Sequence, residues 1–101
     1  YHVWGAARVK GLVLEGLELD YRLVIDGLEL GAVLSVPSIS FWVDGPDGTK
    51  EVWGDTVFLQ WGLDFSPYDM SAATLTLTAR DATGAVATDT RSGTFTCAGV
   101  P

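Results

Sequence analysis

The clearest pattern of apolar and polar positions lies between residues 17 and 36, where two alternating apolar runs flank Asp26-Gly27. Asp-Gly is typical of a type I′ turn, because both central residues of that turn need a positive φ. The pattern therefore predicts a β-hairpin with one apolar face and one mixed face that is open to water. The expected pairs on the apolar face are Ile25 with Leu28, Leu23 with Leu30, Tyr21 with Ala32, Leu19 with Leu34 and Leu17 with Val36.

Alternation continues after this hairpin. Residues 38–44 predict a strand with Ile39, Phe41 and Val43 on one face and Ser40 and Trp42 on the other. Gly45-Pro46-Asp47-Gly48 predicts a turn into a return strand that ends at Trp53. Further strands are expected over residues 56–61, 73–80, 85–90 and 94–97, and residues 62–71 are expected to cross between sheets. Helical spacing of apolar residues is not sustained in any window of the sequence, so no long helix is expected.

Seven or eight short strands separated by regular turns are typical of a sandwich. The sequence of 101 residues therefore predicts an all-β fold, a single-domain antiparallel β-sandwich over residues 17–101. Residues 1–16 are predicted to form an N-terminal arm or a first strand. The alternation changes parity at Glu15-Gly16, which is typical of a β-bulge.

Residues 73–95 carry a Thr-rich strand, an Asp81-Ala82-Thr83-Gly84 turn and a short return strand. This segment resembles the last hairpin of bacterial immunoglobulin-like modules, although Ala85 replaces the Asn that usually follows the glycine. The resemblance implies an immunoglobulin-like sandwich of the kind used in surface adhesins or as extracellular spacers. It implies an extracellular or particle-associated location and carries over no catalytic residue.

The net charge is −7, and the six basic residues are scattered along the chain. Because no basic stripe is available to neutralise phosphates, nucleic acid is not an expected partner. The apolar runs are far shorter than a membrane span, so no membrane insertion is expected.

The inventory of reactive side chains argues against an enzyme. His2 is the only histidine in the sequence, and Cys97 is the only cysteine. A single residue of each type does not support an internal disulfide, a zinc cluster or a typical nucleophile pair. Cys97 is expected to be buried. We predict no catalytic residues and no cofactor. A small hydrolase using paired carboxylates is a further alternative, with the pairs Asp44 and Asp47, Asp64 and Asp69, and Glu18 and Asp20.

Calcium is the more serious metal option, because loop carboxylates at the end of a sandwich supply hard oxygen ligands. The candidates are Asp44, Asp47, Asp69 and Asp81. Their alternative role is to stabilise turns, and no EF-hand spacing is present. We therefore expect no metal.

The aromatic residues suggest a binding face. Trp42, Trp53 and Phe58 are expected to lie on one sheet face, where exposed rings would bind a polysaccharide or a protein chain. The alternative is that these rings are covered, or that their strands alternate in the other parity.

Two functions follow. The first is a non-catalytic structural or adhesive module that assembles with a protein partner or with itself through strand edges, at a cell surface, filament or virion. Its candidate assembly arm, which would pair with a neighbour's edge, comprises Val3, Trp4, Val9, Leu12 and Leu14. The alternative is a carbohydrate-binding module that uses its exposed tryptophans.

Overall fold

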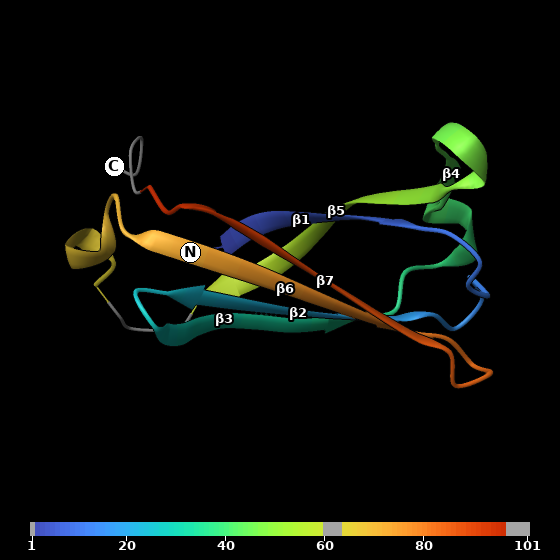
Figure 1. Cartoon of the computed structure of the whole chain (residues 1–101), viewed down its shortest axis with the longest axis horizontal. Helices are drawn as coiled ribbons and strands as arrows, with labels where there is room; N and C mark the ends of the chain where they lie inside the picture. Colours follow the sequence, from blue (N-terminus) through green and yellow to red (C-terminus); the bar gives the residue numbers. More distant parts are fainter. Residues whose placement is uncertain (1, 60–63, 97–101) are drawn as a thin grey trace.

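The computed structural model describes residues 2–59 and 64–96. Within these ranges the chain is all-β, with short 3-10 turns between some of the strands (Figure 1). The strands are β1 (His2–Val9), β2 (Glu18–Ile25), β3 (Leu28–Ser35), β4 (Val43–Asp44), β5 (Lys50–Leu59), β6 (Ala72–Arg80) and β7 (Val86–Thr94). The 3-10 turns are η1 (Ile39–Phe41), η2 (Pro46–Gly48) and η3 (Ser66–Tyr68).

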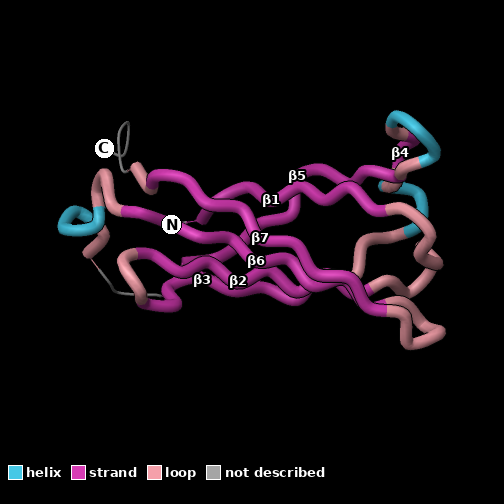
Figure 2. The backbone as a smooth tube through the Cα atoms, in the orientation of Figure 1, coloured by secondary structure: helices cyan, strands magenta, loops and turns pink. Residues whose placement is uncertain are grey.

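The strands follow the hydrogen-bonded order β1-β5-β3-β2-β6-β7, and β4 pairs with β5. Every pair is antiparallel. β5 pairs with β1 over most of its length and meets β3 only at Gly31–Leu59 and Ala32–Phe58, so the sheet turns over at that corner into two layers (Figure 2). The predicted β-sandwich is confirmed, and its immunoglobulin-like topology stays a prediction.

One layer contains β1 and β5, and the other contains β3, β2, β6 and β7. The layers approach closely where Gly5 of β1 passes over Tyr21 of β2, because a Cβ built on Gly5 would lie 2.9 Å from Cε1 of Tyr21. The principal core cluster gathers residues from both layers and from the segments that join them: Ala7, Val9, Leu17, Leu19, Tyr21, Trp42, Val52, Val57 and Ala79.

The hairpin turn at Asp26-Gly27 is confirmed, since φ is 51° at Asp26 and 80° at Gly27. The predicted register is correct only for the pairs nearest the turn, Ile25 with Leu28 and Val24 with Glu29. A β-bulge then follows, and Leu23 pairs with Gly31 instead of Leu30.

The bulge reverses the parity of the rest of β3. Leu30 is inserted into the core with 6% of its surface exposed, and Val33 instead of Ala32 pairs with Tyr21. Leu34, predicted to face inward, is 61% exposed, and Val36 is exposed too. The predicted pairs beyond the bulge are therefore wrong, because an alternating pattern does not reveal an inserted residue.

The strand predicted over residues 38–44 is also mostly absent. Pro37 is followed by the η1 turn, in which the Phe41 N–H donates to the Ser38 carbonyl. The turn shifts the parity, so Trp42 is buried in the core while Ile39, Phe41 and Val43 are exposed. The larger ring is the one removed from water, which agrees with the greater apolar area of tryptophan.

The strand expected over residues 73–80 is confirmed as β6, where Leu75 and Leu77 are half-buried and pack against the core. The interruption expected at residues 91–93 is not seen, because β7 runs unbroken to Thr94. The crossing over residues 62–71 and the strand ending at Cys97 lie partly outside the described residues.

Leu30 and Leu34 test the observed register, because the sequence predicts the same environment for both. We expect Leu30→Ala to lower the free energy of unfolding by about 2–4 kcal/mol, the usual cost of a core cavity. Leu34→Ala should change it by less than about 0.5 kcal/mol, as at other exposed positions. Urea denaturation of both variants measures this, and equal losses would contradict the bulge.

Candidate functional site

The two layers are unequal in width, and this leaves one side of the sandwich open. β1 covers β2, and β5 joins β3, so the narrow layer closes over that half of the wide layer. β6 is only partly covered, and all nine residues of β7 are exposed. We call the opening between the free edge of β1 and the inner faces of β6 and β7 the seam.

The floor of the seam is apolar and its outer wall is charged. Residues paired across an antiparallel ladder share a face. Leu75 pairs with Arg91 and Leu77 with Asp89, so these two charged residues of β7 point to the same side as the core-facing leucines of β6. The inner face of the wide layer thus changes from apolar to charged at β7.

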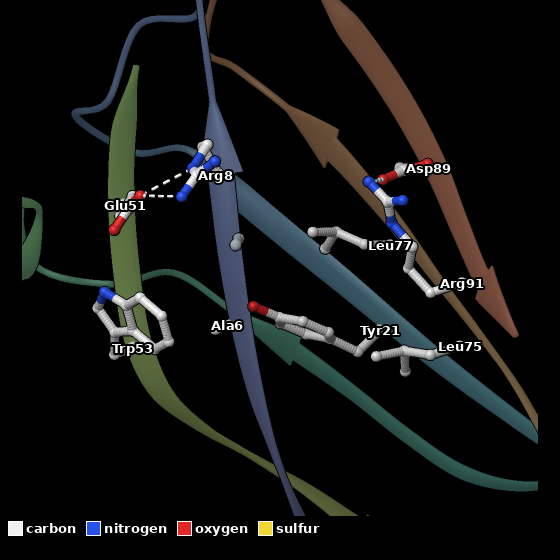
Figure 3. A pocket seen from close by; sticks show the side chains of 10 residues that line it. Ala6, Arg8, Tyr21, Glu51, Trp53, Leu75, Leu77, Asp89 and Arg91 are labelled. Atoms are coloured by element: carbon white, nitrogen blue, oxygen red, sulfur yellow. Dashed lines mark hydrogen bonds and ion pairs between the residues drawn. The ribbon is translucent and has the colours of Figure 1, made fainter. Parts of the chain in front are cut away.

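The seam contains a cavity of about 370 Å³. Figure 3 shows the side chain of Tyr21 reaching from β2 toward β1, with Leu75 and Leu77 beside it. The cavity continues over the edge of β1 onto the outer face of the narrow layer. Its lining is Ala6, Ala7 and Arg8 from β1, Glu51 and Trp53 from β5, Tyr21 from β2, Leu75 and Leu77 from β6, and Asp89 and Arg91 from β7.

Two ion pairs flank this cavity. Arg8 Nη2 lies 2.6 Å from Glu51 Oε1, and Arg91 Nη2 lies 2.9 Å from Asp89 Oδ2. In each pair the cation is the more exposed partner: 57% for Arg8 against 13% for Glu51, and 82% for Arg91 against 62% for Asp89. The seam therefore presents guanidinium groups to solvent, in a chain whose net charge is negative.

The free edge of β1 carries unpaired backbone groups beside Arg8. In antiparallel ladders, alternate residues direct their N–H and C=O to opposite sides of a strand. The Gly45 N–H donates to the Thr49 carbonyl, so the odd-numbered residues at the start of β5 bond toward β4, and Lys50 and Val52 bond toward β1. Arg8 faces Glu51, and its backbone groups consequently point out along the free edge.

The free edge of β7 is partly blocked by the side chain of Asp89. Its odd-numbered residues bond to β6, as the bonds from Asp81 N–H to Ala85 O and from Phe95 N–H to Ser71 O show at either end. The Thr90 N–H therefore points outward, where it donates to Asp89 Oδ1 at 2.9 Å. A short acidic side chain of this kind protects an edge against pairing, which leaves β1 as the more available edge.

The predicted aromatic face does not form. Trp42 lies in the core, with its Nε1 buried and without a hydrogen-bond partner, whereas Trp53 is 68% exposed at the cavity. The side chain of Phe58 lies outside what the structure describes. The error came from the η1 turn, which reverses the side to which Trp42 points.

The predicted assembly arm is placed in the chain's own sheet. Val3 and Trp4 pair with Val57 and Thr56 of β5, although their side chains are not described. Val9 is buried, and Leu12 and Leu14 pack against the core. The sequence analysis assigned no functional role to Arg8, Tyr21, Leu75, Leu77 or Arg91, which the fold gathers at the seam. No sequence signal links these residues, because they lie on strands that are far apart in the chain.

The four calcium candidates are dispersed over the structure. Asp44 pairs with Lys50, and Asp47 occupies the η2 turn with φ of 56°. Asp69 and Asp81 lie at opposite ends of β6. Among the described residues no group of three or more His, Cys, Asp or Glu side chains is arranged to hold a metal.

Asp81 instead links two loops. Its Oδ2 accepts the Val13 N–H at 3.0 Å, and its Oδ1 accepts the Thr83 hydroxyl, the Thr83 N–H and the Ala85 N–H at 2.6 to 3.0 Å. The Thr83 hydroxyl bond, followed by those from the backbone, lowers the pKa of Asp81 from 3.8 to about 2. The carboxylate thereby ties the segment after β1 to the β6–β7 turn.

Comparison of the chain with known family models, curated proteins and solved structures finds no match. Within the described ranges, no helix has the length and apolar character needed to cross a membrane.

Asp81 makes stability depend on acid. Because its pKa is lower in the folded chain, its contribution is complete above about pH 4 and is lost as the pH falls toward 2. We expect Asp81→Asn to be less stable at pH 7, since an amide cannot accept all four bonds, and to lose less stability between pH 4 and 2. Thermal melts across this range measure both effects, and identical pH profiles for the two proteins would contradict the assignment.

Proposed function

We propose that this chain is a non-catalytic assembly module that binds an extended strand of a protein partner along the seam. The observation that carries the proposal is the uncovered floor beside β1, where an unpaired backbone edge adjoins the half-buried Leu75 and Leu77. A strand added to β1 would extend the narrow layer over this floor. Main-chain hydrogen bonds then provide affinity, and alternate side chains provide specificity.

The difference in width between the two layers leaves room for one or two strands beside β1. Neighbouring strands lie about 4.8 Å apart, and the narrow layer has two long strands where the wide layer has four. An added strand would cover the exposed parts of Leu75 and Leu77 on β6. Removing this apolar surface from water favours association by about 25 cal/mol per Å², before the cost of ordering the strand is counted.

The resemblance of residues 73–95 to adhesin-type modules supports placing such an assembly at a cell surface, filament or virion. The sequence-based proposal of a detached arm is changed in one respect. In this form of the proposal, β1 is the acceptor edge and not a donor that leaves its own sheet. Deleting residues 1–10 would therefore remove Ala7 and Val9 from the core and would not test assembly.

Arg8→Pro tests the proposal, because proline removes the outward N–H of the β1 edge and is tolerated where that N–H faces solvent. Panning a phage-displayed random peptide library on the folded protein should enrich peptides with two-residue alternation of apolar residues. These peptides should bind Arg8→Pro at least about tenfold more weakly, a loss of about 1.4 kcal/mol.

Arg8→Gln is the matched control, since it removes the charge but retains the backbone donor. Circular dichroism and thermal melts should show that both variants fold. Failure to enrich alternating peptides, or equal binding to the wild type and to Arg8→Pro, would refute strand addition at β1.

A carbohydrate-binding module is the second candidate, supported by the exposed Trp53 at the edge of a cavity with charged walls. Sugar rings stack on exposed indoles. We expect a polysaccharide ligand to shift the tryptophan emission of the wild type and not of Trp53→Ala. Fluorescence titration with a polysaccharide panel measures this, and the absence of any shift in the wild type would eliminate the candidate.

A further inference from the structure

The charges at the seam specify what kind of strand it accepts. We infer that the bound strand alternates apolar residues with acidic ones, and that it comes from another protein and not from a second copy of this chain. This inference rests on the proposed function and adds the chemistry of the partner.

The apolar residues of the bound strand follow from the apolar floor of the seam. A strand beside β1 directs alternate side chains inward. There they would meet Leu75 and Leu77, which already pack against the edge of the core. Apolar side chains at these positions would complete the core on its open side.

The acidic residues of the bound strand follow from the position of Arg8. Its side chain lies on the outer face of β1, opposite Glu51, and its backbone lies at the free edge. The outward side chains of an added strand would be its cross-strand neighbours on the other side, where opposite charges stabilise the pairing. Glu51 already contacts one side of the guanidinium, and the Arg8 side chain, which is 57% exposed, leaves room for a second carboxylate.

Arg91 adds a second cation across the cavity. The cavity lining contains two of the six basic residues of the sequence, Arg8 and Arg91, and two acidic residues, Glu51 and Asp89, so its formal charge is zero in a chain of net charge −7. Electrostatic screening limits long-range repulsion to about 8 Å at physiological salt. The acidic surface elsewhere on the chain therefore does not repel a strand that has reached the seam, where the carboxylates of Glu51 and Asp89 are each paired with an arginine.

Among the described residues, the long edge strands β1 and β7 do not carry this pattern. β1, with the sequence HVWGAARV, has no acidic residue. β7, with the sequence VATDTRSGT, has one acidic residue, and Asp89 is already bound to Arg91 and to the Thr90 N–H. A second copy would bring Arg8 or Arg91 to the seam and would add like charge, so we assign the site to a different protein.

Designed peptides test this inference directly. Three labelled nine-residue peptides with blocked ends alternate Val with Glu, with Gln or with Lys, and their binding is measured by fluorescence anisotropy at 50 and 200 mM salt. We expect the Val–Glu peptide to bind about threefold to tenfold more tightly than the Val–Gln peptide, and the Val–Lys peptide to bind weakest. The preference should decrease at the higher salt concentration.

Arg8→Gln should reduce the preference for Glu over Gln. Arg22→Gln is the matched control, because it changes the net charge equally but lies on the outer face of β2, paired with Asp20. If Arg22→Gln reduces the preference as much as Arg8→Gln does, local recognition at the seam is wrong.

The outcomes separate the two proposals. Equal binding of the Val–Glu and Val–Gln peptides, both lost in Arg8→Pro, would overturn the acidic specificity and leave strand addition intact. Absence of binding by any of the three peptides, together with a failed library selection, would overturn both. A dimer in light scattering that the Val–Glu peptide dissociates, and that Arg8→Pro does not form, would show that a second copy occupies the seam and would overturn the assignment to a different protein.

Discussion

The close approach of Gly5 to Tyr21 is the contact on which the rest of the structure depends. β1 can lie directly on β2 only because residue 5 has no Cβ, which would come within 2.9 Å of the tyrosine ring. Tyr21 is completely buried beneath this crossing. The contact fixes the position of the narrow layer over β2, and that position leaves the floor beside β6 uncovered. The seam is therefore a consequence of where one glycine allows two strands to touch.

The sequence predicted those parts of the fold that depend on local chemistry. The turn at Asp26-Gly27, the inward positions of Leu19, Tyr21 and Leu23, and the alternation along β6 all follow from positive φ or from two-residue periodicity. These features are set by residues adjacent in the chain, so a single sequence is sufficient to find them.

Features that depend on contacts between distant segments could not be predicted in this way. The bulge at Leu30 places that residue in a second cluster with Leu23, Ile25 and Phe65, a contact that spans more than thirty positions. The η1 turn buries Trp42 in the principal core cluster, and no local rule indicates which of two adjacent aromatic rings will be covered. The seam itself joins β1 to β7, so its residues are almost a whole chain apart. Its charged residues were visible in the sequence, but their proximity was not.

The direction of the two edge strands has a mechanical consequence. β1 begins and β7 ends at the same end of the molecule (Figure 1). Tension applied between these two points would pull each edge strand away from its neighbour, and the hydrogen-bonded pairs would break one after another. Strands loaded along their length would instead resist with all their bonds together. A fold loaded in this way yields at low force, and it opens first at the strands that border the seam.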